Sequence, residues 1–196
     1  GLSTALHPDP YGDCTAAQTG CRAAEVGQED EARDGLEIDH QSLDLVTFYS
    51  RNLGVPEREK LDDPAVLRGK AAFYGLNCQS CHVPKFVTAR LKGQPEQSFQ
   101  LIWPYSDLLL HDMGPGLADG RPEGRASGSE WRTAPLWGIG LTKQVSGHSQ
   151  FLHDGRARDL TEAILWHGGE AQAARDGFMA LPAPDRADLV AFLESL

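Results

Sequence analysis

The stretch from Leu76 to Phe86 reads LNCQSCHVPKF and brings two thiols and an imidazole into five consecutive positions, at Cys78, Cys81 and His82. Such a cluster can bind zinc, exchange disulfides or carry a covalently attached haem. A structural zinc site needs four ligands, and the remaining cysteines lie far upstream at a different spacing. A thioredoxin-like C-x-x-C belongs to a βαβ context, which is absent here. C-x-x-C-H is the attachment signature of a c-type haem, which we therefore predict.

Haem attachment gives these residues distinct roles. The two thiols add to the haem vinyl groups as thioethers, and His82 becomes an axial ligand of the iron. The other axial ligand is a sulfur or an imidazole, unless that position stays open. The chain has two methionines, Met113 and Met179, and His111 is an imidazole alternative. Most methionines only fill gaps in a core, so the residues by themselves leave these candidates open. The histidines expected at the surface or at helix ends are His7, His40, His148 and His167.

The bulk composition limits the partners of the chain. It has 196 residues and a formal net charge of -10, which argues against a nucleic-acid surface, because phosphate binding needs clustered Lys and Arg. The same charge suits a basic redox partner protein, because opposite fields steer encounter. No run of about 18 apolar residues is present, so we predict no transmembrane segment.

The four cysteines of the chain fall into two pairs. Cys14 and Cys21 frame the segment CTAAQTGC and are predicted to form a disulfide across a short loop. A disulfide and a covalently attached haem are both typical of proteins in an oxidising compartment, so we expect an exported, periplasmic protein. The chain opens with neither a Met nor a signal peptide, and is expected to be a mature or truncated product.

Helical signals dominate the first half of the chain. Residues 39–56, DHQSLDLVTFYSRNLGVP, repeat apolar side chains at helical spacing and end in a Gly and Pro stop signal. The next helix is predicted to begin at Asp63, a capping residue, with Pro64 in its first turn, and it leads into Cys78. Gly69 lacks a side chain, so another helix can cross closely there.

The second half combines long loops with three helices. From Val83 to Gly155 the sequence is rich in Pro and Gly and shows no strand alternation. Asp159 and Glu162 form a capping box that opens a helix, a short helix follows, and residues 182–196 form the last one. The prediction is an all-α fold with long ordered loops around a central haem.

Several side chains are candidates for the haem pocket. Guanidinium groups match carboxylate geometry, so arginines can pair with the haem propionates, while aromatic rings can form the walls of the pocket. The arginine candidates are Arg132 and Arg156, and the aromatic candidates are Trp103, Tyr105, Trp137 and Phe151.

A series of longer motifs resembles a known family. GLNCQSCHVPKF, IWPYSDLLLHDMGPGLADGR, EWRTAPLWGIG, FLHDGRARDLTEAILWHGGEA and DRADLVAFLESL occur in this order. Together they resemble the C-terminal haem domain of bacterial di-haem oxidoreductases, also called thiol-oxidoreductase-like, which are related to bacterial cytochrome c peroxidases. The resemblance runs from about Asp13 to Leu196.

The resemblance implies a cytochrome c-like haem domain, predicted at residues 61–196. Its first helix is expected to cross the C-terminal helix near Gly69. The family pattern places the methionine ligand at Met113. The family carries two haems, whereas this chain has one C-x-x-C-H. Residues 1–60 are therefore expected to be a disulfide-stapled arm and helix, the tail of a first domain.

These expectations favour electron transfer through an iron ligated by His82 and Met113, with one covalent haem and no catalytic residue assigned to the chain. Peroxidase-type chemistry, dependent on the first haem domain of a larger protein, is the alternative. It needs an acid–base residue beside an open iron position, for which the candidate pairs are His153 with Asp154 and His167 with Glu170. A third interpretation is a docking domain in which the haem is architectural. The resemblance also implies a calcium site at Asp112 or Asp119.

Overall fold

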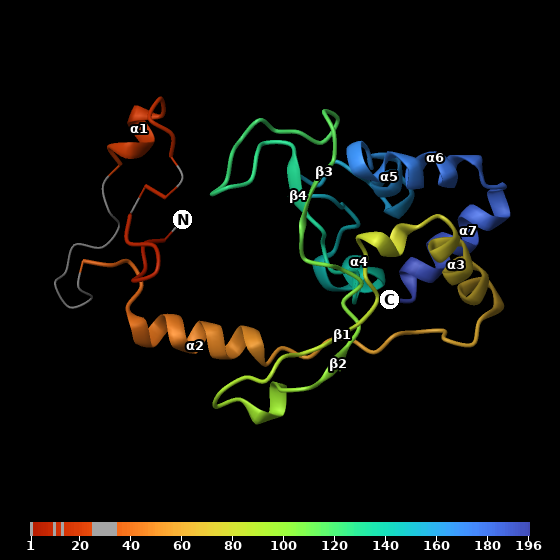
Figure 1. Ribbon diagram of the computed structural model, residues 1–196, viewed down its shortest axis with the longest axis horizontal. Helices are drawn as coiled ribbons and strands as arrows, with labels where there is room; N and C mark the ends of the chain where they lie inside the picture. The colour runs from red at the N-terminus through yellow and green to blue at the C-terminus, as the bar shows by residue number, and fades with distance from the viewer. Residues whose placement is uncertain (1, 10, 13, 25–34) are drawn as a thin grey trace. The chain divides into compact units, whose positions relative to one another are not determined.

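The computed structural model describes residues 2–9, 11–12, 14–24 and 35–196. The chain divides into two compact units, Gly1–Gly54 and Val55–Leu196, whose elements are drawn in Figure 1. The sequence predicted a division between residues 60 and 61. The division lies between Gly54 and Val55, in the extended segment that follows the second helix.

The first unit contains a short helix α1 (Thr19–Arg22) and a longer helix α2 (His40–Arg51). The side chain of Asp39 accepts a hydrogen bond from the backbone N–H of Ser42 at 2.7 Å, which caps α2 as expected for an Asp at this position. The chain before α2 is tied to the beginning of the unit, because Ser3 and Glu37 exchange two backbone-to-side-chain hydrogen bonds at 2.7 and 3.0 Å.

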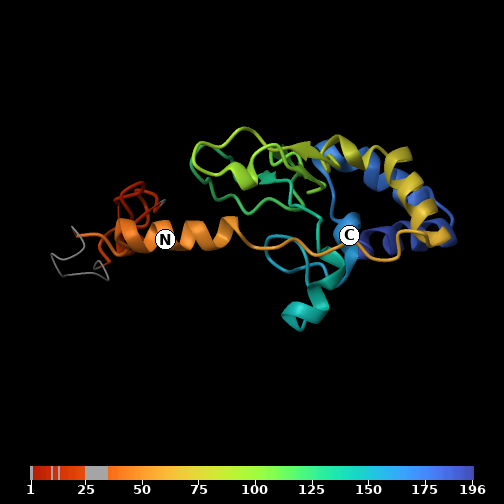
Figure 2. The ribbon, with the colours of Figure 1, turned by 90° about the horizontal axis from the view of Figure 1, so that it is seen from below.

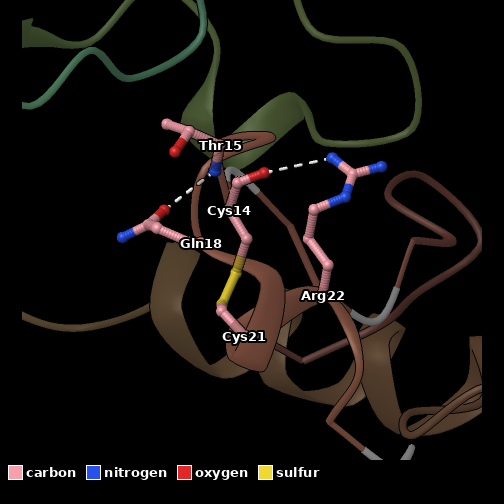
Figure 3. The surroundings of a disulfide bond; sticks show 5 residues. All are labelled: Cys14, Thr15, Gln18, Cys21 and Arg22. Carbon is pink, nitrogen blue, oxygen red and sulfur yellow. Dashed lines mark hydrogen bonds between the residues drawn. A yellow bond between two sulfur atoms is a disulfide. The ribbon is translucent and has the colours of Figure 1, made fainter.

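The predicted disulfide is confirmed. Cys14, in the segment before α1, is joined to Cys21 inside α1, with their Cα atoms 6.1 Å apart (Figure 3). The side chain of Arg22 donates a hydrogen bond to the backbone oxygen of Cys14 at 3.3 Å, and Thr15 N donates to the side-chain oxygen of Gln18 at 2.8 Å. The bond therefore closes a short loop that is also held by local polar contacts.

The second unit is organised by the crossing of α3 (Pro64–Gly75) and α7 (Ala183–Glu194), which lie side by side in Figures 1 and 2. A Cβ placed on Gly69 would overlap the backbone oxygen of Asp188 and lie 2.8 Å from the Cβ of Phe192. Only glycine permits this approach of the two backbones. The helix crossing predicted at Gly69 is confirmed.

The core of this unit forms around the crossing. Phe73, Tyr105 and Phe192 are buried, and their ring centroids lie 5.3 to 6.0 Å from one another in tilted or edge-to-face arrangements. Such pairs add to the stabilisation from apolar burial. The aliphatic members of the same cluster are Val66, Leu136, Leu160, Leu189, Leu193 and Leu196.

Two small antiparallel sheets lie in the region that was predicted to be loop. β1 (Phe86–Val87) pairs with β2 (Leu101–Ile102), and β3 (Leu110–Asp112) pairs with β4 (Glu130–Arg132). The all-α prediction is therefore wrong, because the chain has mixed α and β content. Strands of two or three residues are too short to show a period-two pattern, so the sequence carries no signal for them.

The remaining helices connect these parts. Of the capping box predicted for α5 (Leu160–Leu165), the Asp159 half is confirmed, since its side chain accepts a hydrogen bond from the N–H of Glu162 at 2.8 Å. The Glu162 side chain accepts from the N–H of Arg158 instead. Within the described residues, no helix has the length and apolar character needed to cross a membrane. The other helices, five of them short, are η2 (Cys78–Ser80), η3 (Pro95–Gln97), η4 (Ile139–Leu141), α4 (Thr142–Ser146), η5 (Gly169–Ala171) and α6 (Gln172–Ala180).

Candidate functional site

The C-x-x-C-H segment begins directly after α3. Asn77 adopts a left-handed conformation with φ of 61°, which turns the chain from α3 into η2. The N–H of His82 then donates a hydrogen bond to the backbone oxygen of Cys78 at 3.0 Å. This turn packs the three chemically active residues into one compact loop at the end of a core helix.

The environment of the two thiols opposes thiolate chemistry. Cys78 and Cys81 are not joined to each other. Burial raises the pKa of the Cys78 thiol to about 11 and also raises the pKa of Cys81. Zinc binding and disulfide exchange both use the thiolate, which these surroundings disfavour. Both thiols are free in this structure, and their attachment to haem as thioethers stays a prediction.

His82 is held in one tautomer. Its Nδ1 lies 3.0 Å from the backbone oxygen of Tyr105, and because a carbonyl only accepts, Nδ1 carries the proton. Burial lowers the pKa of His82 to about 4, so the ring is neutral at physiological pH. A neutral imidazole with Nδ1–H donated to a carbonyl and Nε2 free is the arrangement of a metal ligand.

His167 repeats this arrangement. Its Nδ1 lies 2.7 Å from the backbone oxygen of Ala163 in α5, and burial lowers its pKa as well. The bond lies at the C-terminal end of α5, where His167 was predicted to be a surface or capping histidine. In the described part of the chain, Nε2 of His167 has no hydrogen-bond partner, nor has Nε2 of His82. The two ring centroids are 6.4 Å apart with an interplanar angle of 44°.

This spacing fits a haem iron between the two rings. Metal–imidazole bonds are about 2 Å long, so two such bonds in line place the ring centroids roughly 6.3 Å apart. The residues present therefore fit the cofactor predicted from C-x-x-C-H, and the imidazoles of His82 and His167 are the groups that would hold its iron. His167 was not among the candidate iron ligands predicted from the sequence. The one available signal was a histidine followed by two glycines at the end of a capped helix.

The predicted ligand Met113 belongs to a neighbouring loop. A Cβ placed on Gly168 would lie 2.8 Å from the Met113 backbone oxygen, and one on Gly169 would overlap the Asp112 oxygen. Gly169 has a φ of +51°, in the region that favours glycine. The glycines after His167 thus let the Met113 loop approach closely, and iron ligation by Met113 stays a prediction. Met179, in α6, is about half exposed.

His111 is not available as a ligand in this structure. Its Nε2 lies 2.9 Å from Asp107 Oδ2, and its Nδ1 lies 2.9 Å from Glu170 Oε2. Glu170 also accepts a hydrogen bond from the N–H of Asp112 at 2.9 Å. We call these four residues the His111 clamp. The clamp joins β3 to η5, the segment that follows His167, and so holds that segment in place.

The His111 clamp predicts a measurable pH dependence. Its two carboxylates raise the pKa of His111 above the ordinary value, with the Glu170 hydrogen bond as the largest cause. The ion pairs of protonated His111 therefore stabilise the fold fully below about pH 6.5, and this stabilisation is lost as the pH rises through the pKa of His111 in the folded state. We expect Glu170→Gln to lower the pKa of His111 in an NMR titration of the ferrous protein. Glu96→Gln serves as the exposed control. An unchanged His111 pKa in Glu170→Gln would contradict the role of the clamp.

Cys81, Asp107 and His111 offer ligand atoms within 4.8 Å of one another, the one group of this kind in the described residues. The Cys81 thiol lies 3.8 Å from His111 Nδ1. The raised pKa of Cys81 and the paired nitrogens of His111 disfavour a metal ion here. Asp112 and Asp119 lie outside this group, and each accepts a hydrogen bond from a backbone N–H two residues ahead, at 2.7 and 2.8 Å. A calcium site at either one stays a prediction.

The other predicted pocket residues have varied surroundings. Arg156 binds Asp154 at 2.6 Å and the backbone oxygen of Gly116 at 2.5 Å, and its guanidinium lies 4.9 Å from the ring centroid of Trp166. Arg156 therefore packs beside the neighbour of His167. Phe151 packs against the core cluster. Arg132 is exposed in β4. A separate cavity is lined by Trp103, Tyr105 and Trp137.

The candidate acid–base pairs are both engaged in structural contacts. The His153 ring stacks on Trp131 with centroids 3.5 Å apart and an interplanar angle of 12°. Asp154 binds Arg156, as described above. In the second pair, Glu170 belongs to the His111 clamp, and His167 faces His82. Neither pair is arranged as a free acid–base group.

The comparisons with known proteins show which family the chain resembles along its length. The model of the family described as "Di-haem oxidoreductase, putative peroxidase" matches residues 4–196. A solved structure of hydrazine synthase from Kuenenia stuttgartiensis, pressurised with xenon, is 20% identical with a TM-score of 0.51. The match covers 82% of this chain and 57% of the hydrazine synthase chain, and at this identity it concerns the fold. No match was found among curated proteins.

Proposed function

The chain belongs to the di-haem oxidoreductase family, and from this premise we propose that its Val55–Leu196 unit is an electron-transfer domain with one covalent haem. Cys78 and Cys81 would form the thioethers, and the imidazoles of His82 and His167 would hold the iron. The bound haem supplies a one-electron couple between ferric and ferrous iron. With both axial positions taken by protein side chains, the domain passes electrons and does not bind a small substrate at the iron.

One observation carries this proposal: the 6.4 Å between the His82 and His167 ring centroids. It is supported by the matching hydrogen bonds, in which each Nδ1 donates to a backbone carbonyl. These bonds set the tautomer and orient each ring with Nε2 free. Burial keeps both imidazoles neutral, so protons do not compete for Nε2 at physiological pH.

The surrounding residues hold this arrangement rigid. Tyr105 supplies the carbonyl for His82 and lies in the aromatic core beside Phe73 and Phe192. The His111 clamp anchors the loop after His167. A rigid ligand set lowers the reorganisation that accompanies electron transfer, because the same groups remain bound in both oxidation states. The acidic chain suits a basic redox partner, and the disulfide and covalent haem suit an exported, periplasmic protein.

The second candidate function is that of a peroxidase-type oxidoreductase, in which this unit feeds electrons to another haem domain. The family description and the position of Met113 beside Gly168 favour it. In that case Met113 replaces His167 at the iron. A thioether sulfur raises the potential of the couple relative to two imidazoles. The two candidates therefore differ in their midpoint potential.

Haem attachment is tested by measuring how many haem groups each chain carries and whether they can be extracted. We expect one haem per chain in a denatured haemochrome assay, and haem that remains with the polypeptide after acid–acetone extraction. Cys78→Ser with Cys81→Ser should release all of it, since no thioether can form, whereas Cys14→Ser with Cys21→Ser should leave it attached. Extractable haem in the unaltered protein would refute covalent attachment.

A further inference from the structure

Residues 85–103 form a hairpin that leaves the C-x-x-C-H loop and returns to it. Its strands are β1 and β2, joined through η3, and it projects away from the crossing of α3 and α7 (Figures 1 and 2). Where the chain returns, the N–H of Asp107 donates a hydrogen bond to the backbone oxygen of Cys81 at 2.8 Å. Lys85 follows His82 by three residues, so their Cα atoms lie within about 11 Å of each other. A molecule that contacts the base of this hairpin is therefore close to the predicted iron ligand.

Internal hydrogen bonds fix the shape of the hairpin. The N–H of Thr88 donates to the backbone oxygen of Gln100 at 2.9 Å, next to the short ladder of β1 and β2. The buried hydroxyl of Ser98 accepts from the N–H of Leu91 and donates to the backbone oxygen of Gln94, both at 2.9 Å. A two-stranded hairpin is marginally stable by itself, and these bonds hold its turn from within. The hairpin therefore offers a preformed surface, which loses little conformational entropy on binding.

Apolar side chains are exposed on this hairpin. Three of them are more than half exposed, namely Val87 at 63%, Phe99 at 67% and Leu101 at 55%. Val87 and Leu101 are partners in the ladder of β1 and β2, so their side chains lie on the same face of the hairpin. Apolar side chains that gather on one exposed element are typical of an interaction surface.

The same hairpin carries an excess of positive charge. Its basic side chains, all exposed, are Lys85, Arg90 and Lys92, and Glu96 is its one acidic residue. In the described part of the chain, none of the three basic side chains forms an ion pair, and Lys85 Nζ lies 5.4 Å from the ring centroid of Trp103. This local charge is opposite in sign to the net charge of -10. Basic groups that the chain itself leaves without a counter-charge favour an acidic partner.

We propose that the hairpin of residues 85–103 is the docking surface for a redox protein whose contact face is acidic around an apolar centre. The inference rests on the proposed function, because an electron-transfer domain exchanges electrons with both a donor and an acceptor. The acidic remainder of the chain suits a basic protein for one of these roles, and the hairpin takes the acidic protein for the other. Charges farther from the contact than about 8 Å are largely screened at physiological ionic strength, so the hairpin decides which partner docks on it. Its closeness to His82 favours a redox protein over other acidic partners.

Stopped-flow oxidation of the ferrous, haem-loaded protein by plastocyanin, an acidic copper protein, tests the proposal. One electron passes from ferrous haem to Cu(II), which gives ferric haem and Cu(I). We expect the second-order rate constant to fall at least about 10-fold between about 0.01 and about 0.1 M ionic strength, because salt screens the attraction of unlike charges. A rate constant that rises with salt would overturn the proposal, since it would mean that the net charge of the chain controls the encounter.

Two triple variants with the same change in net charge separate the hairpin from the rest of the surface. The hairpin variant combines Lys85→Gln, Arg90→Gln and Lys92→Gln, and should lower the rate constant at low salt at least about 10-fold. The control variant neutralises three exposed basic residues elsewhere, with Arg121→Gln, Arg125→Gln and Lys143→Gln, and should change it less than about 2-fold. Equal effects of the two variants would refute a docking role for the hairpin.

Further measurements distinguish the partner class and the proposed function. Phe99→Ser should lower the rate constant at least about 3-fold at both salt concentrations, because it removes apolar contact and no charge. Binding to phosphatidylglycerol vesicles that only the hairpin variant loses would assign the surface to a membrane and overturn the proposal. Haem that neither hexacyanoferrate(III) nor plastocyanin oxidises would refute electron transfer itself. Normal oxidation by hexacyanoferrate(III), with plastocyanin rates that the hairpin variant leaves unchanged, would refute the docking surface alone.

Discussion

His167→Ala should leave the haem attached and open one axial position of the iron. We expect nearly all of the iron to change from low spin to high spin, because removal of one imidazole weakens the ligand field. The midpoint potential should rise by on the order of 100 mV, since axial ligands set haem potentials over a range of about 0.8 V. Electron paramagnetic resonance of the ferric protein and redox titration measure the two effects.

Met113→Ala is the matched comparison, because its loop packs on the glycines that follow His167. It should remain low spin with a potential close to that of the unaltered protein. His148→Ala, an exposed histidine, controls for the loss of an imidazole elsewhere. If Met113→Ala becomes high spin and His167→Ala stays low spin, then methionine is the ligand and the bis-imidazole proposal is refuted.

Gly69→Ala should destabilise the protein by about 3 kcal/mol or more. The added Cβ would overlap the backbone oxygen of Asp188, and a backbone atom cannot rotate away as a side-chain tip can. The α3–α7 crossing must then open, which also separates Phe73 from Phe192. Urea unfolding of the haem-loaded protein measures the change in free energy.

Gly75→Ala provides the control on the same helix. Gly75 is the last residue of α3, and a Cβ there would meet no atom within 4 Å. The substitution should be neutral or stabilise the protein by up to about 1 kcal/mol, because alanine has the higher helix propensity. Equal destabilisation by both substitutions would mean that helix propensity, and not the crossing, dominates at Gly69.

The local features of the fold were predictable because they depend on neighbouring residues. Asp63 and Asp159 cap their helices as predicted, each through a backbone N–H two or three residues ahead. Gly69 was recognised because a bare position in an apolar helix favours a close crossing. The short strands were not predicted, because strands of two or three residues are too short to show an alternating pattern of apolar and polar side chains. They form where distant loop segments satisfy each other's backbone groups.

The sequence by itself was enough to predict the cofactor: three residues in five positions indicate haem attachment and one axial ligand, because this signature is local and does not depend on the rest of the chain. Only the tertiary structure brought His167 opposite His82. The two histidines lie far apart in the chain. In a sequence, a histidine that caps a helix end cannot be distinguished from one at the same place that binds a metal. What separates the two roles is the direction of its free nitrogen and the ring it faces. Both depend on how α5 and the Met113 loop pack against the end of α3.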